Sequence, residues 1–182
     1  MPRVDTQAHA KRGFGLIELL VAIAIVAILT ATALPSFREM SRRMNVTENT
    51  NNIVAALNTA KSSATKLGAI VGLVGSGNDW SAGGWVVRSD SNFDSTLTGA
   101  DTLIAQYPAL PSGYTLKTKV SGGNDAQIIF GPQGALAAPA TAVDVNVCRP
   151  DNNPAQSSWV HVAASGLITS HKNTAGSPAP GC

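Results

Sequence analysis

The chain has 182 residues, 44% of them hydrophobic and only 13% charged, which suffices for one long helix and one compact domain with its own core. The formal net charge is +2, but residues 1–13 hold the basic excess and the rest is balanced, so no strong basic field favours nucleic acid as a partner. No Cys/His cluster has metal-ligand spacing, and no residue set has the pattern of an enzyme site, so we expect no catalysis, no cofactor and no metal held by such a cluster.

Residues 14–34 form an apolar run with a single charged side chain, Glu18. A helix of about 21 residues spans roughly 30 Å, the thickness of a hydrocarbon core. Lys11 and Arg12 precede the run, and no basic residue follows it before Arg38. This bias favours a cytoplasmic N-terminus and an exported remainder.

Three interpretations of this run compete. A cleaved secretory signal would use the apolar residues 19–29 and an Ala-x-Ala site at 31–33, but Glu18 interrupts the run and the helical pattern continues past the site. A plain membrane anchor leaves Glu18 unexplained, since an ionised carboxylate costs about 3 kcal/mol at mid-membrane and usually has a partner. The third interpretation gives Glu18 a partner on another chain.

Gly13-Phe14 followed by Glu18 resembles the type III signal of type IV pilins and pseudopilins. The resemblance implies that prepilin peptidase removes a leader, residues 1–13, by cutting after Gly13, and methylates Phe14 as the new N-terminus. It implies that Glu18 faces the ammonium of a neighbouring subunit's Phe14, which neutralises both charges in an apolar filament core. Pro35 matches a proline common near the end of this stretch, where it bends or loosens the helix.

The helix is expected to span residues 14–67, with 14–34 in the membrane. Beyond Pro35, apolar residues recur at three- and four-residue steps with polar faces between them. These residues are Phe37, Met40, Met44, Ile53, Leu57, Ala60, Ala64 and Leu67. The pattern predicts an amphipathic helix packed on another element, with Gly68 as its C-cap. The polar gap at 45–52 predicts that part of this stretch is locally irregular or exposed.

Residues 68–182 are predicted to form a β-rich head. Turn residues separate seven runs with β propensity, and the last run contains a hairpin turn near Gly166. The runs are "AIVGLV", "GWVVR", "TLIAQY", "YTLKTKV", "AQIIFG", "AVDVNVC" and "SSWVHVAASGLITSH". No helical crossover separates them, so we expect a mainly antiparallel sheet packed on the apolar face of the helix, an α+β fold.

Cys148 and Cys182 fall in the part predicted to be exported, where oxidation is allowed. A disulfide between them closes a loop of about 35 residues and contributes roughly 4 kcal/mol on the chain-entropy model. The alternative is two unpaired thiols, one buried and one at a frayed terminus.

The resemblance narrows to the GspH/FimT family of minor pilins and minor pseudopilins. It rests on "NNIVAALNTAKSSATKLG", "GGWVVRSD", "IIFGPQG" and "VNVC", which follow one another along almost the whole chain. It implies one long N-terminal helix and a β-rich head, in agreement with the patterns above.

Binding of DNA during natural transformation is an alternative function, because some members of this family resemble DNA receptors with a Gly-Arg-x-Arg stretch near the C-terminus. The corresponding residues here, 166–169, contain neither arginine, which removes the phosphate-contacting groups. The remaining weak candidates for a DNA-binding cluster are Lys117, Lys119, Arg149 and Lys172.

The segment "DSNFDSTLTGAD" at 90–101 has a spacing similar to that of an EF-hand calcium loop. Its weak candidate ligands are Asp90, Asn92, Asp94, Thr96 and Asp101. Ser95 replaces the turn glycine, Asp101 replaces the bidentate glutamate, and no flanking helix is evident. A polar surface loop built on Asx turns is the favoured interpretation.

Together, these features predict a minor type IV pilin that helps prime pilus assembly, joins the pilus near its tip, and supports motility or adhesion. Its expected partners are other minor and major pilins, prepilin peptidase and the inner-membrane assembly platform. It is expected to cross the bacterial inner membrane once, with a periplasmic head, before it reaches the cell surface in a pilus. A minor pseudopilin of type II secretion remains an alternative.

Overall fold

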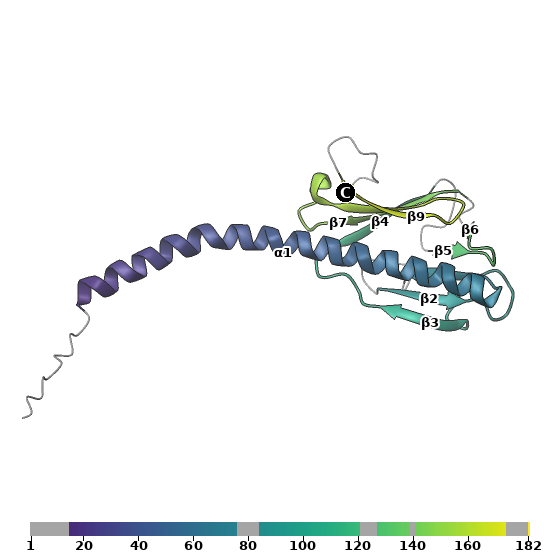
Figure 1. Ribbon diagram of the computed structural model, residues 1–182. Coiled ribbons are helices and arrows are strands. Elements are labelled where there is room, and N and C mark those ends of the chain that lie inside the picture. Colours follow the sequence, from purple (N-terminus) through teal and green to yellow (C-terminus); the bar gives the residue numbers. More distant parts are fainter. Residues whose placement is uncertain (1–14, 76–83, 121–126, 139–140, 174–181) are drawn as a thin grey trace, which may run out of the picture. The chain divides into compact units, whose positions relative to one another are not determined.

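The computed structural model describes residues 15–75, 84–120, 127–138, 141–173 and 182. These residues form one long helix, nine strands and a short 3-10 helix (Figure 1). The chain divides into two compact units, Met1–Ser41 and Arg42–Cys182. We refer to Arg42–Cys182 as the second unit, and all strands belong to it.

Helix α1 spans Leu16–Leu67, a length of 52 residues. Gly68 follows it with φ +62°, and the Ala69 N–H donates to the Ala64 carbonyl at 3.3 Å. This is the longer bond of a Schellman motif, which requires a left-handed residue after the helix. The predicted C-cap at Gly68 is confirmed.

Two antiparallel sheets follow the helix. The first has five strands in the order β3-β2-β1-β5-β6, and the second has four in the order β4-β7-β8-β9. Their bounds are β1 Val71–Gly75, β2 Trp85–Ser89, β3 Thr102–Tyr107, β4 Thr115–Val120, β5 Gln127–Phe130, β6 Leu136–Ala138, β7 Val143–Cys148, β8 Ser158–Val162 and β9 Ile168–Lys172. The predicted α+β fold with antiparallel pairing is confirmed, although the strands divide into two sheets rather than one.

The seven predicted runs correspond to eight strands, since the last run folds into β8 and β9. In the turn between them the Gly166 N–H donates to the Ala163 carbonyl at 2.7 Å, and Gly166 has φ +78°. A side chain at this position would place its Cβ 1.9 Å from the Gly134 carbonyl oxygen, so only glycine fits. The predicted hairpin is confirmed.

Two short elements were not predicted. Strand β6 contains only Leu and Ala, and its pairing with β5 defines it. The 3-10 helix η2, Pro154–Gln156, is capped by Asn153, whose side chain accepts the Ala155 N–H. Neither element has a periodicity long enough to be recognised in sequence.

The main core lies between α1 and both sheets, and Figure 1 shows the C-terminal half of α1 running alongside their strands. Its largest buried side chain, Trp85, stacks on Tyr107 with ring centroids 6.2 Å apart. The helix residues of the core are Val46, Ile53, Ala56, Leu57, Ala60 and Ala64. The predicted helical stripe from Ile53 to Ala64 is therefore the packed face.

The polar stretch 45–52 is a regular part of α1, and three of its side chains are buried. Thr50 Oγ1 donates to the Val46 carbonyl and Asn49 Nδ2 to the Asn45 carbonyl, both at 2.7 Å. Such bonds to the preceding helical turn satisfy the polar atoms, so these side chains can be buried. The expected irregularity is therefore wrong, whereas the expected exposure of part of the stretch is confirmed at Thr47, Glu48 and Asn51.

The packed face of α1 is also shorter than predicted. Phe37, Met40, Met44 and Leu67 are more than half exposed within this chain, and burial begins only at Val46. Apolar periodicity indicates which face of a helix is apolar, but it does not show where the chain's own core ends.

Candidate functional site

The N-terminal part of α1 is apolar and uncovered by its own chain. Its most apolar window has a mean hydropathy of 2.5, and no residue of that window is buried. Leu16 and Ile17 are 78% and 72% exposed, and the large side chains that follow are about half exposed or more. By length and composition this helix can cross a membrane. Apolar surface on this scale requires a lipid or protein cover.

Glu18 is the acidic residue of the first helical turn and is exposed. Its backbone N–H donates to the Gly15 carbonyl at 3.0 Å. A carboxylate near a helix N-terminus interacts favourably with the helix dipole, which stabilises the first turn in any environment. Gly13 and Phe14 lie outside the described residues, so the cleavage site, the methylation and the pairing of Glu18 stay predictions.

Other polar groups of the apolar segment are satisfied within the helix. Thr30 Oγ1 donates to the Val26 carbonyl at 2.8 Å, and Thr32 Oγ1 to the Leu29 carbonyl at 3.0 Å. Helix α1 continues through Pro35, although a proline has no N–H for the usual bond to the preceding turn. Glu18 is thus a charged group without a counter-ion: the described part of this segment contains no residue of opposite charge.

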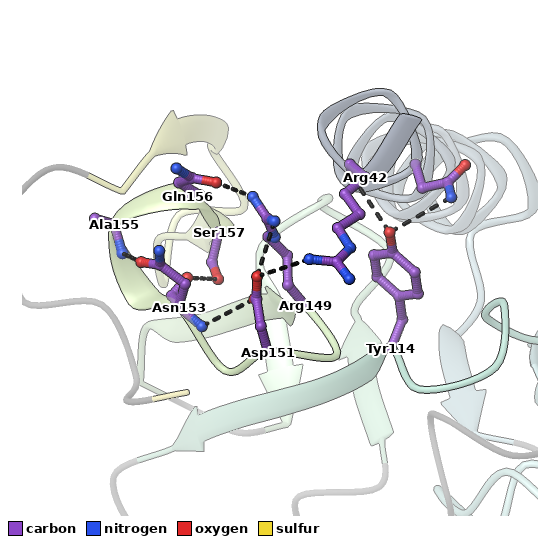
Figure 2. Close-up of polar contacts among 9 residues, drawn as sticks. Arg42, Tyr114, Arg149, Asp151, Asn153, Ala155, Gln156 and Ser157 are labelled. Carbon is purple, nitrogen blue, oxygen red and sulfur yellow. Dashed lines mark hydrogen bonds and ion pairs between the residues drawn. The ribbon is translucent and has the colours of Figure 1, made fainter. Parts of the chain in front are cut away.

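In the second unit, Arg149 is buried in a network that joins α1 to the loop after β7 (Figure 2). Its guanidinium contacts the side chain of Gln156 and lies 2.9 Å from Asp151 Oδ2. The same carboxylate oxygen lies 3.4 Å from Arg42 NH1, and Tyr114 Oη donates to the Arg42 carbonyl at 3.4 Å. Arg149 is 1% exposed. Its guanidinium therefore contacts the interior and the loop and does not reach the surface.

The candidate DNA-binding residues whose side chains are described, Lys117, Arg149 and Lys172, do not form one exposed cluster. Lys117 on β4 and Lys172 on β9 are exposed, but β4 and β9 are the two opposite edges of their sheet. The burial of Arg149 contradicts its assignment as a surface contact for phosphate. The side chain of Lys119 lies outside the described residues.

The loop 90–101 folds around its own carboxylates. Asp90 is 4% exposed and accepts the backbone N–H groups of Phe93 and Ser95 at 2.7 and 2.9 Å. Asp101, also 4% exposed, accepts the N–H groups of Thr98 and Ser91 at 2.7 and 3.2 Å. The bonds from the Thr98 and then the Ser91 backbone lower the pKa of Asp101 below its ordinary value.

Asp94 closes a smaller turn of the same loop. Its Oδ1 accepts the Thr96 hydroxyl at 2.6 Å and the Thr96 N–H at 2.8 Å, and these bonds lower the pKa of Asp94. Within the described residues, no group of three or more His, Cys, Asp or Glu side chains is placed to hold a metal ion. These hydrogen bonds match the favoured interpretation of a polar loop built on Asx turns.

Cys148 at the end of β7 forms a disulfide with Cys182, so the predicted pairing is confirmed and the alternative of unpaired thiols is wrong. Cys148 is fully buried. Asn146 Nδ2 donates to Cys182 Sγ at 3.1 Å. The bridge therefore fixes residue 182 to the second sheet.

One polar cluster escaped the sequence analysis. His161 Nδ1 lies 2.6 Å from Asp144 Oδ1, and Trp159 stacks on His171 with ring centroids 4.6 Å apart. These residues lie on the face of the second sheet opposite the buried Val160 and Val162. In sequence, the alternation of residues in "SWVHV" indicates that Trp159 and His161 lie on the same face of a strand. Only the pairing of β7, β8 and β9 brings the four side chains together.

Comparison with known proteins agrees with this architecture. Residues 49–166 match the family described as type II transport protein GspH, and residues 8–34 match the prokaryotic N-terminal methylation motif. A fimbrial protein of Pseudomonas aeruginosa is 44% identical over 55 residues, which cover 30% of this chain and 35% of that protein. A fimbrial protein of Moraxella nonliquefaciens is 48% identical over 40 residues, 22% of this chain and 26% of the relative. This chain thus matches about a third or less of the length of these relatives.

Two solved structures share the fold. The type IV minor pilin FimU of Pseudomonas aeruginosa aligns with a TM-score of 0.53 and 16% identity, over 74% of this chain and 92% of that one. The minor pseudopilin EpsH of the Vibrio cholerae type 2 secretion system aligns with a TM-score of 0.52 and 11% identity, over 70% and 97%. A long N-terminal helix packed on antiparallel sheets is therefore a pilin fold.

The match over residues 49–166 shows more than the fold, because it covers more than half of the chain. The chain belongs to the GspH family of minor pilins and minor pseudopilins. Proteins of this family are structural subunits rather than enzymes.

Proposed function

We propose that this chain is a minor type IV pilin that helps prime pilus assembly and is incorporated near the tip of the filament. The observation that supports this most directly is the apolar N-terminal part of α1, which its own chain leaves uncovered and which carries one carboxylate, Glu18. A membrane covers such a surface before assembly, and the helices of other pilins cover it afterwards.

The proposed life of the chain has three stages. It is made as a prepilin with leader 1–13, and prepilin peptidase cuts after Gly13 and methylates Phe14. It then crosses the inner membrane once through residues 14–34, with a cytoplasmic N-terminus and a periplasmic head formed by residues 68–182. Finally, the inner-membrane assembly platform moves it into a pilus with other minor and major pilins.

In this proposal Glu18 sets the axial alignment of neighbouring pilin helices. A neighbouring subunit's methylated N-terminal ammonium lies against the Glu18 carboxylate, and each charge compensates for the other in an apolar surrounding. Displacing the helices along their axes separates the two charges, so the pair favours one axial arrangement. Pro35 then marks the end of the membrane-spanning part, where the helix lacks one backbone bond.

Piliation of an in-frame deletion strain tests the priming role. We expect near-complete loss of sheared surface pili, restored when the wild-type gene is supplied in trans, and a matching loss of pilus-dependent motility or adhesion. Normal piliation of the deletion strain would contradict priming and would favour another role for the same fold.

A minor pseudopilin of type II secretion is the second candidate, and the likeness to EpsH is the observation that favours it. The TM-scores to EpsH and FimU are nearly equal, 0.52 and 0.53, so fold alone does not discriminate between the two branches. Exported enzyme activity in the medium of the deletion strain does: loss of secretion with intact pili would favour the pseudopilin, whereas intact secretion with lost pili would favour the pilin. DNA binding is not favoured, because Arg149 is buried and Lys117 and Lys172 lie on opposite edges of their sheet.

A further inference from the structure

A polar cleft lies between α1 and β9 within the second unit. It has two parts, of about 320 Å³ and about 290 Å³, which share Thr47, Ser158 and Lys172 in their lining. We call this feature the α1–β9 cleft. Volumes of about 300 Å³ are typical of sites that hold a small ligand or a few side chains.

The charged residues that line the cleft are cations. Arg43 from α1 and Lys172 from β9 line it, and its described lining contains no carboxylate. Thr47 and Ser158 also line the cleft, and the Thr47 hydroxyl already donates to the Arg43 carbonyl at 3.0 Å. A negatively charged group is therefore the complementary occupant.

Asn173 places a hydrogen-bond acceptor in the same cleft. It lines the cleft and is 7% exposed, and its Oδ1 has no hydrogen-bond partner among the described residues. A buried acceptor without a partner costs free energy until a donor reaches it. An occupant that donates a hydrogen bond as well as carrying negative charge would satisfy both features of the cleft, and a peptide combines the two.

The backbone of β9 offers the same combination. The Ala163 N–H bonds to the Leu167 carbonyl and the Asn173 N–H to the Ser157 carbonyl, which fixes the phase of the ladder between β8 and β9. Because bonded and non-bonded pairs alternate in an antiparallel ladder, the N–H and C=O groups of Ser170 and Lys172 point away from β8. Among the described residues, no strand pairs with the other side of β9, so these groups face an edge that is open there.

The side chains of β8 and β9 that face α1 change from apolar to polar along the strands. On the face of the sheet toward α1, the paired residues change from Val162 and Ile168 to Val160 and Ser170, and then to Ser158 and Lys172. Polar groups thus replace core residues where the cleft opens.

We propose that an extended acidic segment of a neighbouring pilin subunit adds to the open edge of β9 as an extra strand and places a carboxylate in the α1–β9 cleft. Lys172 and Arg43 face that carboxylate, and main-chain bonds to Ser170 and Lys172 hold the segment in register, as in other cases of strand addition. This inference rests on the proposed function, because it requires a filament in which pilin subunits are neighbours.

Lysine acetylation of the full-length chain tests this contact. Sheared wild-type filaments and the detergent-solubilised chain are treated with an amine-acetylating reagent, and modification of each lysine is measured by mass spectrometry. We expect acetylation of Lys172 to be about tenfold slower in filaments, because an interface excludes the reagent. Lys117, exposed on the opposite edge of the same sheet, is the matched control. A zero-length carbodiimide is expected to join Lys172 to an Asp or Glu of another subunit.

Equal acetylation of Lys172 in both preparations would overturn the inference and leave the proposed function intact. Absence of the chain from the wild-type filaments would overturn both. Protection that nuclease treatment abolishes would assign the cleft to nucleic acid and would also overturn the peptide assignment.

Two variants at Ser170 separate strand addition from a purely electrostatic contact. Ser170→Pro removes an N–H that points to the open edge and leaves the bonds between β8 and β9 in place, whereas Ser170→Ala keeps the N–H. The thermal midpoint of each solubilised variant first establishes that it is folded. We expect Ser170→Pro to lose the protection of Lys172 and Ser170→Ala to keep it. Protection that persists in a folded Ser170→Pro chain would contradict strand addition.

Discussion

At the scale of single residues, two charges of this chain stand in opposite situations. Arg149 is buried, and its own loop provides Asp151 and Gln156 as partners. Glu18 lies in an apolar segment whose other polar groups are satisfied within the helix. A charge compensated within the chain supports folding, whereas a charge that lacks such a partner supports an interaction with another molecule.

The substitution Glu18→Ala tests the proposed pairing. We expect membrane insertion to be retained or improved, because a charge is removed from an apolar helix, and the amount of the chain in sheared filaments to fall about tenfold. Immunoblots of the membrane and filament fractions measure both quantities. Glu18→Asp is the matched variant that keeps the charge on a shorter side chain. Equal amounts of wild type and Glu18→Ala in filaments would contradict the pairing.

Removal of the Arg149 side chain should weaken the second unit. Arg149→Met keeps much of the volume but leaves Asp151 and Gln156 without their shared donor, so we expect the free energy of unfolding to fall by about 2 kcal/mol. Urea unfolding of the detergent-solubilised chain measures the change, and Lys117→Met on the exposed face of β4 serves as a control with little effect. Equal stability of the two variants would mean that the network in Figure 2 contributes nothing.

Asp101 should make stability depend on acidity. Its pKa is lowered in the folded chain, mainly by the Thr98 and then the Ser91 N–H groups, so the unfolded state binds the proton more readily than the folded state. The stabilisation is complete above the unfolded pKa of about 3.9 and is lost as the pH falls through the lower folded pKa. We expect Asp101→Asn to flatten the acid limb of the thermal midpoint against pH. An unchanged acid limb would show that these bonds do not survive in solution.

At the scale of elements, the sequence patterns located the long helix, its C-cap and most strands, because each has a period or a turn residue that local physics imposes. The division of the strands into two sheets could not be predicted from the sequence. It depends on which strands pair, and pairing is decided by long-range packing. The stretch 45–52 shows the limit most clearly: Asn49 and Thr50 are polar in sequence, yet bonds to their own helix allow them to be buried.

The candidate sites divide in a similar way. The processing motif and Glu18 are local signals that can be read without a structure. The burial of Arg149, the separation of Lys117 from Lys172 and the α1–β9 cleft all depend on strand order. A basic residue in sequence therefore indicates charge, but not whether that charge is at the surface.

The disulfide should stabilise the second unit by tying residue 182 to β7. We expect Cys182→Ser to lower the free energy of unfolding by roughly 4 kcal/mol, because the unfolded chain regains the entropy of an open loop. Urea unfolding with and without a reductant measures this, and reduced wild type should match the variant. A variant as stable as the oxidised wild type would show that the bridge adds no stability.

The loop 90–101 should not respond to calcium. Its carboxylates already accept loop hydrogen bonds, so an ion would have to displace them. We expect about 1 mM calcium, a concentration suited to weak extracellular sites, to leave the thermal midpoint unchanged. A rise in the midpoint that Asp90→Asn abolishes would establish a calcium site and contradict this interpretation.

At the scale of the whole molecule, the chain combines a part with its own core and a part without one. The second unit buries an apolar core. A disulfide fixes residue 182 to the same unit. The N-terminal part of α1 has no buried residue in its most apolar window. This division fits a subunit that folds by itself at one end and completes its burial through a membrane or other helices at the other.

The most direct test of the proposed function is mass spectrometry of the N-terminus of this chain in sheared surface filaments. We predict a terminal peptide that begins at methylated Phe14, with residues 1–13 removed. A chain that is absent from the filaments, or one that still carries its leader there, would contradict the proposal that it is a processed pilin subunit.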